Sequence, residues 1–217
     1  SVLSIGMLFS ILVCSTPIIV HGENLIQNGS FEYGISPPTG SYRLMHASDS
    51  DFDDITSWIV SSGQIDWVYT HAHASDGIYS IDLCGLSAGK IEQSFATTVG
   101  QQYIVNFDMS GNPSGSKGVK LLEVAAAAQS QIFSFDTTGN SATNMNWTMK
   151  TWTFSATSTT TTLSFRSLSD YSSYGPMIDN VRVSPACECD LNRDGKCDMR
   201  DWLLFGKNWG RTDCPVQ

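Results

Sequence analysis

The sequence predicts an all-β fold, a two-sheet sandwich of the jelly-roll kind, followed by a small loop and helix near the C-terminus. Three observations lead to this prediction. Apolar and polar residues alternate in many short segments, which is typical of strands with one buried face. Gly, Pro, Asn and Asp cluster between those segments, as turn residues do. Only 15% of residues are charged, and Ser, Thr and Gly are abundant, which favours strands and turns over a helical bundle.

The alternating segments follow one another along the chain at 64–69, 79–83, 103–109, 131–135, 151–154, 162–165 and 179–183. Turn signals separate them at 75–77, 111–113, 138–140 and 174–176. The alanine run in 121–128 fits either a strand or a helical turn, and the Thr- and Ser-rich 157–162 fits a β-branched hairpin. We expect 35–57 to be a long loop, a β domain over 23–185 and a separate tail over 186–217.

The N-terminus predicts an export signal. Residues 2–13 are a mostly apolar run that is too short to span a bilayer comfortably. Val20 and Gly22 then fit cleavage after Gly22. We therefore expect a signal peptide over 1–22 and a secreted, extracellular or cell-surface protein, with a buried N-terminal strand as the alternative.

The net charge limits the classes of partner, and the positions of the cysteines indicate their state. The net charge of −9 repels phosphate backbones, so we expect no nucleic-acid partner, and it attracts cations. Cys84 lies in an apolar strand pattern and is expected to be a lone buried thiol. The tail holds four more cysteines, whose pairing the sequence leaves open: Cys187, Cys189, Cys197 and Cys214.

The tail carries a twelve-residue pattern typical of a calcium loop, which supplies oxygen ligands from positions one, three, five, seven, nine and twelve. Those positions are Asp190, Asn192, Asp194, the Lys196 carbonyl, Asp198 and Asp201. Gly195 stands at position six, where the loop turns sharply. A short amphipathic, EF-hand-like helix is expected to begin at Asp201 and end near Gly206 or Gly210.

This pattern resembles the type I dockerin repeat over about residues 190–210, which implies Ca²⁺ binding. Dockerins that bind cohesins carry two such repeats, and this chain carries one. The single repeat weighs against a cohesin partner and favours a tail that calcium stabilises.

The order of segments in the β domain resembles the choice-of-anchor C family of secreted bacterial proteins, which is related to plant cell-wall proteins and to galactose-binding-like jelly rolls. The segments that carry the resemblance are 24–32, 55–58, 63–68, 75–83, 89–95, 111–113 and 175–183. The resemblance covers about residues 24–184. It implies a jelly roll, an extracellular location and association with a polysaccharide or cell-wall glycan, without an established catalytic activity.

Carbohydrate-binding jelly rolls also hold a structural calcium between their opening and closing segments. By this resemblance Glu32 and Asp179 are candidate ligands. Asp179 shares strand parity with Val181 and Val183, so we expect it to point inward, where a carboxylate needs a partner or a metal. An Asp satisfied by backbone donors is the alternative.

A sugar site needs flat aromatic faces beside hydrogen-bonding groups. The best candidate patch runs from a strand into a loop and consists of Asp66, Trp67, Tyr69, His71 and His73. Trp67 and Tyr69 share parity with Ile65, so the alternative is that both belong to the core. His71 and His73 have the spacing of a metal pair, but without an evident third ligand we interpret it as incidental.

Three classes of function remain. We favour a non-catalytic carbohydrate- or cell-wall-binding protein without catalytic residues. A structural or adhesive matrix protein is the alternative. A polysaccharide-cleaving enzyme needs only two placed carboxylates, for which four acids are available: Asp66, Asp82, Glu92 and Asp108. No zinc motif or phosphate loop is present in the sequence, which disfavours the enzyme.

Overall fold

The computed structural model describes residues 24–48, 53–115, 117–169, 173–186 and 199–208. The predicted signal peptide 1–22 and residues 190–198 of the predicted calcium loop therefore lie outside the described residues. The strands are β1 Tyr42–His46, β2 Ile59–Ser62, β3 Gln64–Val68, β4 Ser80–Asp82, β5 Lys90–Ala96, β6 Gln102–Gly111, β7 Val119–Ala126, β8 Gln129–Asp136, β9 Thr148–Ser155, β10 Thr160–Ser167 and β11 Pro176–Pro185.

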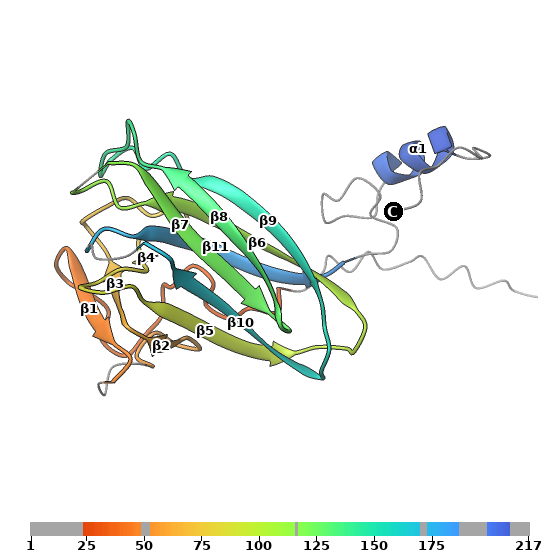
Figure 1. The fold of residues 1–217 in the computed structure, drawn as a ribbon, viewed down its shortest axis with the longest axis horizontal. Helices are drawn as coiled ribbons and strands as arrows, with labels where there is room; N and C mark the ends of the chain where they lie inside the picture. Colours follow the sequence, from red (N-terminus) through yellow and green to blue (C-terminus); the bar gives the residue numbers. More distant parts are fainter. Residues whose placement is uncertain (1–23, 49–52, 116, 170–172, 187–198, 209–217) are drawn as a thin grey trace, which may run out of the picture.

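The strands form two antiparallel sheets that pack face to face (Figure 1). One sheet has the order β1-β3-β4-β11-β6-β9, and the other has the order β2-β5-β10-β7-β8. Neighbours that are distant in sequence, such as β11 between β4 and β6, give the crossovers of a jelly roll. The predicted all-β jelly-roll sandwich is confirmed.

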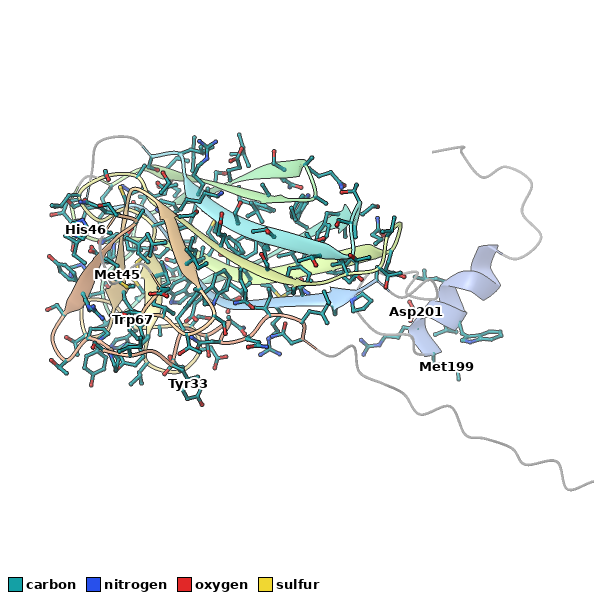
Figure 2. All side chains as sticks on the ribbon, turned by 90° about the horizontal axis from the view of Figure 1, so that it is seen from below. Tyr33, Met45, His46, Trp67, Met199 and Asp201 are labelled. Carbon is teal, nitrogen blue, oxygen red and sulfur yellow. The ribbon has the colours of Figure 1, made fainter. Side chains whose placement is uncertain are left out.

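Large side chains from both sheets fill the space between them. The rings of Phe31 and Trp58 have centroids 5.3 Å apart, and Trp58 lies 6.2 Å from Phe165, which lies 5.2 Å from Phe107. Each tilted or edge-on pair adds about 0.5–1.5 kcal/mol beyond the burial of its surface. Figure 2 shows Met45 and Trp67 inside the sandwich, whereas Tyr33 projects from it.

A tight hairpin decides between the strand and the helical turn that the sequence left open at 121–128. Residues 119–126 are strand β7, and Ala126 pairs with Gln129 across a two-residue turn. Both turn residues have positive φ, 50° at Ala127 and 59° at Ala128, as a type I′ turn requires. The alanine run is therefore a strand that ends in a turn.

The long loop expected over 35–57 is wrong for 42–46. These residues form the edge strand β1, which pairs antiparallel with β3 from Tyr42 opposite Val68 to His46 opposite Gln64. Apart from Met45, the residues of β1 are only partly buried or exposed, so the strand shows weak alternation in the sequence. The segment is a strand because it pairs with β3, and its own apolar pattern gives little indication of this.

Loops cover the outer face of the six-stranded sheet at β3, β4 and β11. Val68 and Met177 on this face pack with Ala72 and Met145 from two loops in a second buried cluster. Trp147 packs partly against the same cluster. Outward-pointing residues of β3, β4 and β11 are therefore buried as well.

Helix α1, Met199–Asn208, confirms the helix expected in the tail. It begins two residues before the predicted start, and Asp201 is buried in its first turn (Figure 2). Within the described residues no helix combines the length and the apolar character that crossing a bilayer requires.

Candidate functional site

An open pocket of about 370 Å³ lies beside the segment that joins β3 to β4. Its lining consists of Tyr69, Thr70, His73, Ala74, Gly77 and Ile78. An aromatic ring, an imidazole, a hydroxyl and an exposed aliphatic side chain thus face one cavity. Two of these residues, Tyr69 and His73, belong to the patch predicted from the sequence.

The aromatic ladder, the contacting rings of Trp67, Tyr79 and Tyr69, holds the Tyr69 ring in place. The Tyr69 ring lies 5.3 Å from that of Tyr79, which lies 5.4 Å from Trp67. Trp67 is fully buried, and its Nε1 donates a hydrogen bond of 3.0 Å to the Phe31 carbonyl. Packing therefore transmits the rigidity of the core to the half-buried ring at the pocket.

Hydrogen bonds from neighbouring loops hold the first half of the segment. The amide of Tyr69 donates to the Ser41 carbonyl at 3.0 Å, and the Thr70 hydroxyl donates to the Gly40 carbonyl at 3.1 Å. The His73 amide donates to Ala142, and the His73 carbonyl accepts from the Trp147 indole, both at 2.9 Å. These bonds limit the conformations available to the polar groups of the pocket.

Two carboxylates hold the second half. Glu32 Oε1 accepts the amides of Ile78 at 2.9 Å and Tyr79 at 2.8 Å. Asp179 Oδ2 accepts those of Ser75 at 2.7 Å and Asp76 at 2.9 Å. Bonds from amides to a charged acceptor are among the stronger ones in proteins, so the turn is firmly held.

A β-bulge orients Asp179 toward this turn. The pairing of β11 with β6 shifts between Asp179 and Arg182, and Asn180 has a φ of 51°. Because the extra residue breaks the alternation, Ile178 and Val181 face the core and Asp179 does not. The expectation that Asp179 shares the inward parity of Val181 is therefore wrong, although Asp179 is fully buried.

Burial raises the pKa of Asp179 to about 7, and the amides of Asp76, Asn180 and Ser75 partly oppose that rise by stabilising the charged form. A carboxylate has about four acceptor sites, so these three amides leave about one of them for a further partner. Within the described ranges no group of three or more His, Cys, Asp or Glu side chains has metal-binding geometry. The contacts thus assign Glu32 and Asp179 to holding the turn, and calcium at this pair stays a prediction.

The structure separates the other members of the predicted patch. Trp67 is in the core and Asp66 is 7% exposed, so neither side chain reaches the pocket. His71 lies beside the pocket lining, where its Nε2 is 3.4 Å from Asn112 Oδ1 and 3.3 Å from Ser114 Oγ. The residues that the sequence interpretation missed are Thr70, Ala74, Gly77 and Ile78, although the turn signal at 75–77 pointed to part of this wall.

Two further clefts among the described residues differ in chemistry. One, of about 590 Å³, borders β5 and residues 24–27, and Phe95, its aromatic residue, is 8% exposed. The other, of about 360 Å³, has a lining without aromatic rings on β5, β7 and β10. The pocket at Tyr69 is therefore the better candidate for a ligand with both apolar and hydroxyl faces.

Of the metal ligands predicted in the tail, Asp201 lies within the described residues, and the loop positions Asp190, Asn192, Asp194, Lys196 and Asp198 lie outside them. Asp201 is 3% exposed at the start of α1. An aspartate entering a helix is the arrangement expected for position twelve of the loop.

Comparison with known proteins identifies the family to which the β domain is similar. The profile of the family described as "Protein of unknown function (DUF642)" matches residues 24–184. Halomucin from Haloquadratum walsbyi is 35% identical over 162 residues, which are 74% of this chain. The chain spans only 2% of the length of that relative.

Solved structures of similar fold include several sugar-related proteins. An arabinose-bound GH51 α-L-arabinofuranosidase aligns with a TM-score of 0.52 at 12% identity, over 86% of this chain and 30% of the enzyme. TmCBM61 in complex with β-1,4-galactotriose aligns with a TM-score of 0.45 at 18% identity, over 75% of this chain and 99% of the module. A family 16 carbohydrate-binding module aligns with a TM-score of 0.42 at 16% identity, over 74% of this chain and 99% of the module. At these identities the likeness concerns the fold.

Proposed function

Because the chain belongs to the DUF642 family, whose description assigns no activity, we propose from the pocket itself that the β domain binds a carbohydrate without cleaving it. The observation that carries the proposal is the joint presence of the Tyr69 ring, the Thr70 hydroxyl and the His73 imidazole at one pocket. The match covers the β domain, so the resemblance to the choice-of-anchor C family and to dockerins stays a prediction.

The chemistry of the pocket suits a sugar. A pyranose presents C–H groups on one face, which pack against a flat ring, and hydroxyls at its rim, which exchange hydrogen bonds with side chains. Tyr69 supplies the ring, while Thr70 and His73 supply donors and acceptors. Ile78, 52% exposed, offers a second apolar contact in the same lining.

Rigidity supports the same proposal. Ordering a loop and its side chains on binding costs about 0.5–1.5 kcal/mol for each flexible side chain. Here the aromatic ladder and the bonds to Ser41, Glu32 and Asp179 hold the loop before any ligand arrives. A weak ligand such as a small saccharide therefore loses little affinity to ordering.

The lining also supports binding rather than hydrolysis. Glycoside hydrolysis uses two carboxyl groups that flank the scissile bond. None of the six lining residues is an acid, and the nearby Glu32 carboxylate is engaged by backbone amides. We further propose that the protein acts outside the cell or at its surface, with a tail that Ca²⁺ stabilises.

The test is a glycan array followed by calorimetric titration of the best ligand. The Tyr69→Ala variant should weaken binding about five-fold, because the loss of one stacking contact costs about 1 kcal/mol. Tyr33→Ala removes a tyrosine that is 70% exposed and does not line the pocket, so it should bind like the parent chain. Equal affinity of both variants, or no binding to any glycan, would contradict the proposal.

A further inference from the structure

A second buried polar group lies on the outer face of the six-stranded sheet, away from the lining of the pocket. Asp66 on β3 is directly opposite Asp82 on β4, so the two carboxyl groups share one face of the sheet. Ser80 precedes Asp82 by two residues and therefore lies on that same face. The exposed fractions are 7% for Asp66 and 0% for Ser80 and Asp82.

The three residues differ in how many hydrogen-bond partners their polar atoms have. Asp82 Oδ1 accepts the amides of Cys84 at 2.9 Å and Gly175 at 3.0 Å, and Asp82 Oδ2 accepts the Asn112 side-chain amide at 2.7 Å. Asp66 Oδ1 and Ser80 Oγ are buried without any hydrogen-bond partner. A buried acceptor left in this state is costly, so two such atoms on one face of the sheet require an explanation.

Positive charge from the chain does not balance the two acids. The ion pairs found among the described residues join Arg43 to Asp54, Lys90 to Glu92, and Arg166 to Glu123, and none reaches Asp66 or Asp82. The neighbours of Asp66 on β1 and Asp82 on β11 in the sheet are Leu44 and Met177, which are apolar. Two acids thus share a buried, largely apolar environment.

We propose that Asp66, Ser80 and Asp82 form a binding site for one hard divalent cation. The unpartnered Oδ1 of Asp66 and Oγ of Ser80 would be its ligands, together with the Asp82 carboxylate. Oxygen-only donors with two carboxylates select Ca²⁺ or Mg²⁺ over softer metals. The cation would give a partner to both orphaned atoms and neutralise the pair.

A proton shared by Asp66 and Asp82 explains the unpartnered atoms less completely than a bound cation does. Burial raises the pKa of Asp82 to about 8 and that of Asp66 to about 6, and the negative charge of Asp66 contributes to the rise at Asp82. At neutral pH a proton on Asp82 leaves Asp66 mostly ionised. A proton that bridges the two acids gives a partner to Asp66 Oδ1 and leaves Ser80 Oγ without one, whereas a cation accepts lone pairs from both groups.

The test counts cations bound to the full chain after treatment with EDTA. Equilibrium dialysis at pH 8 with Ca²⁺ and, separately, Mg²⁺ should find one ion fewer on Asp66→Asn than on the parent chain. Ser80→Ala keeps both charges and should retain the ion with about ten-fold weaker affinity or more. Asp136→Asn, an exposed acid whose carboxylate bonds to Thr138, should bind as the parent chain does.

Thermal unfolding supplies a second readout, in which the comparison of variants separates this site from the other predicted calcium sites. Adding the cation should raise the Tm of the parent chain more at pH 8 than at pH 5, where protons compete for the two acids. That difference should be smaller in Asp66→Asn than in the parent chain, and NaCl at matched ionic strength should not reproduce it. Equal ion counts and equal Tm shifts for the parent chain and Asp66→Asn, or no bound ion at all, would overturn the proposal.

Discussion

The carboxylate of Glu32 lies directly against Gly77. A Cβ added at residue 77 would lie 2.4 Å from the carboxyl carbon of Glu32, and Gly77 has a φ of 71°. Both the space and the backbone conformation at this turn therefore require glycine. Because Gly77 lines the pocket, the contact joins the anchoring of the loop to the shape of the site.

Gly77→Ala should unfold more easily than the parent chain and bind its glycan more weakly. Positive φ alone costs about 1 kcal/mol for alanine, and displacement of the Glu32 carboxylate adds to that cost. Gly139→Ala is the matched control, because Gly139 has a φ of 83° and open space around it. Urea unfolding should show that Gly77→Ala loses more unfolding free energy than Gly139→Ala does. Equal losses would show that the contact between Glu32 and residue 77 does not contribute to stability.

Trp67→Ala should destabilise the whole domain and not act as a clean binding variant. The side chain is fully buried, bonded to the Phe31 carbonyl and packed against Tyr79. Truncation of a buried tryptophan costs about 3–5 kcal/mol. The measurement is the free energy of unfolding, and a loss below about 1 kcal/mol would contradict the placement of this ring in the core.

Replacing Ala127-Ala128 by Asn-Gly should stabilise the protein. Both alanines hold positive φ in the two-residue turn between β7 and β8, a conformation that Asn and Gly adopt at lower cost. The expected gain is about 1 kcal/mol, seen as a rise in Tm. Ala125→Gly, inside strand β7, should have the opposite sign, which separates turn chemistry from a general effect of glycine.

Without metal, stability should fall as pH rises from about 5 to about 8.5. The pKa of Asp66 is raised to about 6, that of Asp179 to about 7 and that of Asp82 to about 8, whereas an unfolded aspartate titrates near 3.9. Between those values the folded chain holds more protons than the unfolded chain, so its stability decreases with rising pH.

The pH dependence is measured as Tm in EDTA at several pH values. Asp66→Asn, which removes one of the three raised groups without removing a hydrogen bond, should reduce the slope and raise the Tm at pH 8.5. Asp136→Asn should not reduce this slope, since hydrogen bonds from the Thr138 amide and hydroxyl lower the pKa of that exposed acid instead of raising it. A Tm that increases toward pH 8.5 in EDTA would contradict the burial of these carboxyls.

The tail loop gives a separate calcium prediction. Asp190→Asn combined with Asp194→Asn removes two of the expected ligands and should abolish one binding event in calorimetric titration of the full chain with Ca²⁺. The sandwich should keep its Tm in EDTA, because these positions lie outside the β domain. Unchanged stoichiometry would reject the dockerin-like interpretation of residues 190–201.

The sequence predicted the elements whose alternation reflects a local core and missed those that depend on distant partners. Strands β6 and β11 are evident from their apolar spacing, whereas β1 becomes a strand only by pairing with β3. The bulge at Asn180 broke the parity expected for Asp179, because a single inserted residue has no signature in an alternating pattern.

The site was predicted in part for a similar reason. Tyr69 and His73 follow a strand with a clear pattern, and the loop around them brings both to the pocket. Asp66 points away from the core as its parity indicates, yet loops cover that face of the sheet and bury it. Period-two alternation shows which side of a strand a residue is on, but it does not show whether that side meets water.

The bond between the Ser75 amide and Asp179 joins residues 104 positions apart, and the latter lies on the last strand. During synthesis the loop with Tyr69 and His73 is made long before the carboxylate that anchors it. A nascent or truncated chain that lacks β11 would therefore carry this loop with the Glu32 anchor alone. The turn at 75–76 would gain its second carboxylate only after the last strand has joined the sheet.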